Sequence, residues 1–331
     1  MTRRTNVVAI SLVATLLVTA CRPDARATAP DRSPPVPSST SPTGTGPSGP
    51  GPTTPAGSVP GIPGTLYYLA DDALVRLDRS GPVQVLPHNG LLANPSPDGQ
   101  RVAYLSDGGL VVADRAGQHP QRLRGGLADH GAEPAWSPDS TQVLVAEARS
   151  GSIGRPVVVD VRTGLSRPLA HDVGLHPLWS ADGRHLAYTS GVCEVLVADV
   201  DGGRPRKVPV LGDLDRTRNP DQARSCDPVS VSPDGSRIAL VLHTGDEPDG
   251  DIARGLLANA VIDTATGHRV ILPVQGDLRG ACYRADGSLL VRTRATDGRY
   301  TLTLLSPTNT VLATVQEPAT TRNMELLGWV R

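Results

Sequence analysis

The sequence predicts an all-β protein, a six-bladed β-propeller of four-stranded antiparallel blades that follows a signal peptide and a disordered linker. Three observations lead to this prediction. One short motif recurs five times, each copy is followed by segments of β-forming residues, and the last residues of the chain supply the strand that the first blade lacks. The 331 residues are 38% hydrophobic and 20% charged, which fits a folded domain of this size.

The recurring motif has the form Trp/Val-Ser-Pro-Asp-Gly. Its five copies begin at Pro95, Trp136, Trp179, Val231 and Tyr283. The aspartates of successive copies are 41, 43, 52 and 52 residues apart. A fixed unit of about 40–50 residues is typical of propeller blades.

Each copy is followed by segments with the composition and alternation of β-strands. Second strands of the blades are expected at 101–105, 142–146, 185–189, 237–242 and 288–292. Third strands are expected at 110–114, 157–160, 195–199, 260–263 and 301–305, and short fourth strands at segments such as 121–123 and 268–272. Four strands in each repeat are the pattern of one propeller blade.

The two ends of the propeller region together supply a sixth blade. Residues 64–69, 74–78 and 83–86 are expected as its second, third and fourth strands, and residues 326–329 as its first strand. Pairing these distant segments closes the ring and removes the exposed edges of an open sheet. Six blades leave about 44 residues for each, whereas seven would leave about 38, which is shorter than the motif spacing.

The motif copies resemble the WD-like repeats of the TolB β-propeller family, and the resemblance extends over nearly all of residues 65–331. The family includes envelope scaffolds and the propeller halves of serine peptidases, so the resemblance implies a fold more strongly than a function. The α/β domain of TolB itself is replaced here by a linker, and we expect no hydrolase domain. The sequence has no Gly-x-Ser-x-Gly elbow, which argues against a Ser-His-Asp hydrolase.

Residues 1–20 have the features of a bacterial signal peptide. Arg3 and Arg4 precede about twelve mostly apolar residues, too few to span a membrane. Val18-Thr19-Ala20-Cys21 resembles a lipobox, which implies cleavage before Cys21 and a covalent diacylglycerol and acyl group at this residue. The alternative is an ordinary secretory leader. We expect export by the Sec route rather than the twin-arginine route, and an extracytoplasmic protein anchored by lipid to the bacterial cell membrane.

After Cys21, the segment up to residue 64 is rich in Pro, Gly, Ser and Thr. Such a composition cannot bury enough apolar surface to offset the entropy of ordering, so we expect a disordered linker. As a coil it would span roughly 35–40 Å and would hold the propeller at 65–331 away from the membrane. Recognition of proline motifs or O-glycosylation are the alternatives.

The charge and aromatic content argue against a nucleic-acid partner. The formal net charge is −1, Lys207 is the only lysine, and the chain has 3 Trp, 6 Tyr and no Phe. A nucleic-acid binder would need a basic surface and more rings for stacking. We therefore expect no nucleic-acid partner, and we expect the protein to be a monomer.

The motif aspartates are interpreted as structural rather than catalytic. In a Pro-Asp-Gly turn a short carboxylate accepts backbone N–H groups. The residues concerned are Asp98, Asp139, Asp182, Asp234 and Asp286. The tryptophans of the motif are likewise expected to pack between blades rather than to stack on a ligand.

Departures from the repeat are the places where a propeller is expected to carry specificity. Insertions at 147–156, 212–228 and 243–257 are expected on one face of the disc. Carboxylates in the last of these could bind Ca²⁺, the alternative being a solvated acidic loop. The weak metal candidates are Asp246, Asp249 and Asp251 together with His130, His171 and His176, whose imidazoles could converge with His88 on a transition metal or could be scattered loop residues.

Three cysteines remain after Cys21. Cys193 and Cys226 are expected on the same face, and in an oxidising compartment we expect them to form a disulfide. Cys282 is expected to be a small buried apolar residue.

The favoured function is that of a non-catalytic scaffold in the cell envelope, whose propeller binds a protein, peptide or glycan partner and needs no cofactor. The alternative is an enzyme or a metal-dependent binder that uses the central funnel, as propeller lactonases and quinone dehydrogenases do. That alternative predicts Asp, Glu, His or Asn side chains from at least three blades at the axis.

Overall fold

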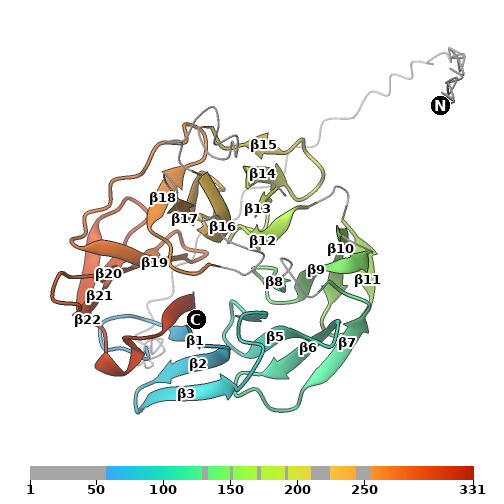
Figure 1. The fold of residues 1–331 in the computed structure, drawn as a ribbon, viewed down its shortest axis with the longest axis horizontal. Coiled ribbons are helices and arrows are strands. Elements are labelled where there is room, and N and C mark those ends of the chain that lie inside the picture. Colours follow the sequence, from blue (N-terminus) through green and yellow to red (C-terminus); the bar gives the residue numbers. More distant parts are fainter. Residues whose placement is uncertain are drawn as a thin grey trace, which may run out of the picture. The chain divides into compact units, whose positions relative to one another are not determined.

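The computed structural model describes residues 57–128, 133–149, 152–169, 173–190, 193–209, 224–243 and 255–331. These residues form six antiparallel β-sheets arranged around a common axis, which confirms the predicted six-bladed β-propeller (Figure 1). Residues 1–56, including the expected signal peptide and Cys21, lie outside the described residues. In the described part of the chain, no helix is long and apolar enough to cross a membrane.

Each of the first three blades contains four strands. Blade 1 consists of β23 (Glu325–Val330), β1 (Thr65–Ala70), β2 (Ala73–Asp78) and β3 (Gly81–Leu86). Blade 2 consists of β4 (Ala93–Pro95), β5 (Arg101–Ser106), β6 (Gly109–Asp114) and β7 (Gln121–Gly125). Blade 3 consists of β8 (Ala135–Trp136), β9 (Gln142–Arg149), β10 (Ser152–Asp160) and β11 (Ser166–Pro168).

The strands of blades 4 to 6, like those of blades 1 to 3 above, are given in order from the axis outward. Blade 4 consists of β12 (Leu175–Trp179), β13 (His185–Thr189), β14 (Val195–Asp199) and β15 (Arg206–Lys207). Blade 5 consists of β16 (Arg224–Val231), β17 (Arg237–His243) and β18 (Ala260–Asp263). Blade 6 consists of β19 (Asp277–Tyr283), β20 (Leu289–Arg294), β21 (Tyr300–Leu305) and β22 (Val311–Gln316), and a short 3₁₀ helix, η1 (Ala319–Thr321), leads from it to β23.

Blade 5 differs from the prediction at its outer edge. The expected fourth strand at 268–272 is reduced to an isolated bridge between Ile262 and Arg269, and Ile271 is 91% exposed. Val270 still donates its backbone N–H to the carbonyl oxygen of Val261 at 2.7 Å. Pro273 follows three residues later and has no N–H to contribute to a ladder, which limits how far this pairing extends.

The insertion expected at 147–156 is also different. It extends the hairpin of β9 and β10, with Arg149 paired to Ser152 and Ala148 paired to Ile153. The register shifts between Ile153 and Pro156, where a glycine and a proline interrupt regular pairing. The described part of this segment is therefore strand rather than loop.

The ring closes as predicted. β23 pairs antiparallel with β1, with Trp329 opposite Leu66 and Thr65 opposite Val330, so the red C-terminal strand lies beside the blue first blade (Figure 1). The innermost strands contact one another in the cyclic order β23, β4, β8, β12, β16, β19 and back to β23.

The hydrophobic core is divided among the six junctions between neighbouring blades. Each of six buried clusters combines strands from two adjacent blades, for example Leu66 and Trp329 of blade 1 with Leu290 and Leu302 of blade 6. Because side chains alternate between the two faces of a strand, a blade covered on both faces needs apolar residues on both. This explains the continuous apolar runs of the second and third strands.

The packed chain begins before the predicted boundary at residue 65. Val59 and Ile62 form a bridge with each other, are 4% and 2% exposed, and belong to the core at the junction of blades 1 and 6. The side chain of Ser58 also accepts the backbone N–H of Leu66 at 3.1 Å. Residues 57–64 are therefore part of the propeller and not of the linker that the composition predicted.

The motif turns satisfy their own polar groups. In four copies the serine hydroxyl donates to Oδ1 of the aspartate at 2.5–2.7 Å and accepts the backbone N–H of the residue five positions after it at 2.9 Å. In all five copies the aspartate also accepts the backbone N–H two residues later. The carboxylates therefore act within the turns that join first and second strands.

A buried ionic cluster joins blade 6 to blade 1. The Arg292 guanidinium donates to Glu317 at 2.9 Å, and neither side chain is accessible to solvent. Tyr68 of β1 donates to the other oxygen of Glu317 at 2.6 Å, and Arg292 also donates to the carbonyl oxygens of Met324 and Thr321. Burial and the neighbouring Glu317 carboxylate hold the pKa of Tyr68 well above its usual range, so its hydroxyl remains a donor.

Candidate functional site: the axial cavity

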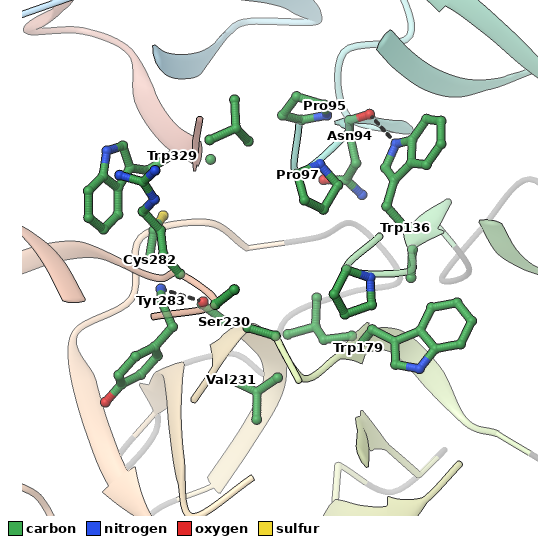
Figure 2. A pocket seen from close by; sticks show the side chains of 18 of the residues that line it. Asn94, Pro95, Pro97, Trp136, Trp179, Ser230, Val231, Cys282, Tyr283 and Trp329 are labelled. Atoms are coloured by element: carbon green, nitrogen blue, oxygen red, sulfur yellow. Dashed lines mark hydrogen bonds between the residues drawn. The ribbon is translucent and has the colours of Figure 1, made fainter. Parts of the chain in front are cut away.

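An axial cavity of about 380 Å³ lies where the six innermost strands approach their motif turns (Figure 2). All six blades contribute to its wall, through residues of β4, β8, β12, β16, β19 and β23 and through the turns that follow β4, β8, β12 and β19. Its volume lies within the range of small-molecule sites, about 300–1,000 Å³. Much of the wall is apolar, with Pro95, Pro134, Leu178, Val229 and Val231 among its residues.

All three tryptophans of the chain line this cavity. Trp136 donates its indole N–H to the carbonyl oxygen of Asn94 in the preceding blade at 2.9 Å, and Trp329 donates to that of Pro63 at 2.7 Å. Both rings are buried in core clusters between blades. The tryptophans therefore do pack between blades, and the same residues also line the cavity.

Arg284 is the cavity residue that departs most from the motif. It stands at the position that serine occupies in the other four copies. Its guanidinium carbon lies 4.4 Å from the centre of the Trp329 ring, within the range of a cation–π contact. Its Nη1 donates to the carbonyl oxygen of Pro63 over 3.4 Å.

The charges at the cavity wall are of both signs. Burial lowers the pKa of Arg284, the neighbouring Asp286 raises it, and the nearby Arg331 lowers it further. Asp98 and Asp139 also line the cavity, but each accepts a serine hydroxyl and a backbone N–H within its own turn. Burial raises the pKa of Asp139, and the hydrogen bonds from Ser137 and Thr141 outweigh it, so this carboxyl stays ionised.

The metal candidates are not brought together in the described structure. His130, His171, Asp246, Asp249 and Asp251 lie outside the described residues. His88 is exposed on the connection between blades 1 and 2. Among the described residues there is no group of three or more His, Cys, Asp or Glu side chains that could hold a metal ion.

His176 has a different environment from the one expected for a loop residue. It is 1% exposed within β12, and its Nδ1 lies 2.9 Å from Oε2 of Glu133, which is also buried. Its backbone φ is +49°, a conformation that few non-glycine residues adopt. Glu133 was not predicted as a site residue, because no motif surrounds it in the sequence.

Cys193 and Cys226 form a disulfide in the structure. It joins the β13–β14 connection of blade 4 to β16 of blade 5. The Thr189 hydroxyl donates to the carbonyl oxygen of Cys226 at 3.1 Å beside it. Cys282 is buried in the core between blades 1 and 6, as expected.

The cavity lies on the face of the propeller that carries the motif turns, and these turns were predicted to be structural. Specificity was expected at the insertions, on the opposite face from the motif turns. Arg284 was the missed residue, although its position was visible in the sequence as the one charged residue in place of the motif serine. The proximity of Arg284 to Trp329 was not visible, because it depends on closure of the ring.

Comparison with known proteins finds distant structural similarity. No protein-family model matches the sequence, and no curated protein matches it. Similar solved structures include a chain of a nidogen/laminin complex, with 12% identity and a TM-score of 0.47 over 80% of this chain and 96% of that chain. Others are an oligogalacturonate lyase in complex with manganese (16%, TM-score 0.45, 72% and 69%) and a prolyl endopeptidase (16%, TM-score 0.43, 77% and 43%).

Proposed function

We propose that this protein is a non-catalytic binding scaffold of the bacterial cell envelope, anchored to the membrane by lipid at Cys21. Its propeller holds a protein, peptide or glycan partner, and the axial cavity receives part of that partner. The observation that carries the proposal is the cavity itself, a concave site of about 380 Å³ whose wall comes from all six blades.

The construction of the wall suits binding. A ring of six contacting inner strands holds the lining residues on rigid elements, so the cavity is formed before a ligand arrives. The serine and aspartate groups at its edge are engaged in their own turns and hold the wall in place. Proline and tryptophan side chains present apolar surface with little rotamer freedom to lose on binding.

The anchor is supported by the first residues of the chain. Val18-Thr19-Ala20-Cys21 follows an apolar segment of signal-peptide length, and a proline-rich segment separates Cys21 from residue 57. Replacing Cys21 by alanine should abolish incorporation of a labelled fatty acid and release the protein from the membrane fraction. Unchanged labelling of Cys21→Ala would contradict the anchor.

The binding function is tested by crosslinking in cells followed by mass spectrometry of co-purified proteins. The intact chain should recover one stoichiometric partner that a control carrying only residues 1–56 does not recover. If no partner, peptide or glycan is recovered with the intact chain, the scaffold function is wrong.

A pair of substitutions at Ala181 tests the role of the cavity. Ala181 lines the cavity at the motif position where three other copies have proline. Ala181→Trp should fill the space and reduce partner recovery at least tenfold, whereas Ala181→Pro should leave recovery unchanged. Circular dichroism and thermal unfolding of both variants show whether the propeller is intact. Equal recovery with a folded Ala181→Trp would place the partner elsewhere on the ring.

A further inference from the structure

Arg284 is an arginine placed where the repeat calls for a turn-forming serine. In the other four copies the serine hydroxyl bridges the motif aspartate and the backbone. An arginine cannot make this compact bridge. In blade 6 the Asp286 carboxylate accepts the backbone N–H of Ser288 at 2.9 Å, as the motif aspartate does in the other copies, and Arg284 lines the cavity.

The contacts of Arg284 hold its side chain in place but engage few of its N–H donors. The cation–π contact with Trp329 restrains the guanidinium, and the 3.4 Å hydrogen bond to Pro63 engages one of five N–H groups. Within the described residues Arg284 forms no ion pair with a carboxylate. The nearby positive charge of Arg331, which also lines the cavity, adds repulsion that a bound anion would relieve.

The rest of the cavity limits which anion fits. A planar guanidinium matches a carboxylate through two parallel hydrogen bonds. The carboxylates of Asp98 and Asp139 at the same wall would repel a phosphate dianion more strongly than a single negative charge. The proline, valine and leucine residues of the wall require that the remainder of the ligand be apolar.

We propose that the axial cavity binds a ligand with one carboxylate attached to an apolar body, and that Arg284 receives the carboxylate. This inference rests on the proposed binding function and specifies the ligand. The carboxylate is either the C-terminus of a peptide with an apolar last residue or a free organic acid.

The tryptophans provide the measurement. Because all three line the cavity, intrinsic tryptophan fluorescence reports on this site without background from other parts of the chain. The probes are N-acetyl-leucine and acetyl-Ala-Ala-Leu, each compared with its C-terminal amide, which has the same shape and no charge. Both acids should give a saturable change, and each amide should bind at least tenfold more weakly. Tighter binding of the peptide acid would assign a peptide C-terminus, and tighter binding of N-acetyl-leucine would assign a free acid.

The key variant is Arg284→Ser, which restores the motif found in four other copies and should therefore fold. It should weaken binding of both acids at least tenfold and abolish the preference for acid over amide. Arg162→Ser removes an equal charge from an exposed turn outside the cavity and should change neither. Inorganic phosphate should not displace the acids from the intact protein.

Three results would overturn the inference. They are the absence of a saturable response to any of the four probes, equal binding of acid and amide, and unchanged acid binding by Arg284→Ser. Displacement by phosphate would overturn the choice of a carboxylate. In each case, recovery of a partner that depends on residue 181 would show that the proposed function stands while its ligand was wrongly assigned.

Discussion

The junction between blades 2 and 3 and the junction between blades 6 and 1 both stack an arginine on a tryptophan, with different results. Arg101 lies 5.3 Å from the centre of the Trp136 ring, donates to the carbonyl oxygen of Ser140 and lies 3.9 Å from Asp98. Arg284 lies 4.4 Å from Trp329 and makes one long hydrogen bond. Where the motif is intact the turn groups engage the arginine, and where its serine is replaced the arginine remains available to a ligand.

Neighbouring blades are also joined by different kinds of interaction. The junction of blades 6 and 1 contains the buried Arg292–Glu317 pair, whereas blades 4 and 5 are joined by the Cys193–Cys226 disulfide. The first depends on hydrogen-bond geometry and the second on a covalent bond. Substitutions that remove these contacts one at a time should therefore differ in their effect on stability.

Glu317→Ala should have the largest effect on stability. It leaves the Arg292 charge buried without its partner and should lower the free energy of unfolding by about 3–5 kcal/mol. Chemical denaturation followed by circular dichroism measures this change. As a control, Asp297→Ala disrupts the exposed pair with Arg299 and should lower the free energy of unfolding far less. Equal losses in the two variants would show that the buried pair does not secure ring closure.

Removing the disulfide should have the next largest effect. The bridge closes a loop with a sequence separation of 33, and its loss should lower the free energy of unfolding by about 2–4 kcal/mol. The measurement is the unfolding midpoint of the intact protein with and without a reducing agent. The double variant Cys193→Ser with Cys226→Ser should be insensitive to the reducing agent. A midpoint of the intact protein that does not change on reduction would contradict this prediction.

Opposite substitutions at the position of the motif serine distinguish the intact turns from the altered turn of blade 6. Ser137→Ala removes the bonds to Asp139 and to the N–H of Gln142 and should destabilise the propeller by about 1–2 kcal/mol. In blade 6 the backbone N–H of Arg284 donates to the carbonyl oxygen of Ser288, and Asp286 accepts the N–H of Ser288, without a serine at position 284, so Arg284→Ser should cost no stability. Thermal unfolding compares the two variants with the intact protein. A loss of stability in Arg284→Ser as large as that in Ser137→Ala would show that Arg284 has a structural role.

Acid should weaken the intact turns while leaving the stacked arginines charged. Burial raises the pKa values of Asp182 and Asp234, but hydrogen bonds from Ser180, Ser232 and nearby backbone groups outweigh it and hold these values below the usual range. A carboxyl whose pKa is lower in the folded state stabilises the fold above its unfolded pKa, about 3.9. This contribution is lost as the pH falls through the folded value. The melting temperature should therefore decrease below about pH 4.

Replacement of Asp182 by asparagine provides the control for this pH dependence. The variant should be less stable at neutral pH and should lose less further stability on acidification. An identical pH profile for Asp182→Asn and the intact protein would assign the acid sensitivity to other carboxyl groups.

Much of the fold could be predicted from the sequence because its causes are local. Turn chemistry and strand alternation act within one repeat, so five motif copies and their spacing were sufficient to place most strands. The match of Trp329 to the motif predicted closure of the ring, and β23 pairs with β1 accordingly. The reduced fourth strand of blade 5 and the packed residues 57–64 were mispredicted, because local composition does not show which neighbour covers a segment.

The candidate site, unlike the strands and turns, depends on contacts between blades. The sequence alone showed that serine is replaced at Arg284 and that the chain has three tryptophans. Only the tertiary structure placed Arg284 of blade 6 against Trp329 of blade 1, Arg292 against Glu317, and all three tryptophans around one cavity. The physical reason is that these contacts form between blades, where closure of the ring and packing of its six inner strands decide which side chains meet.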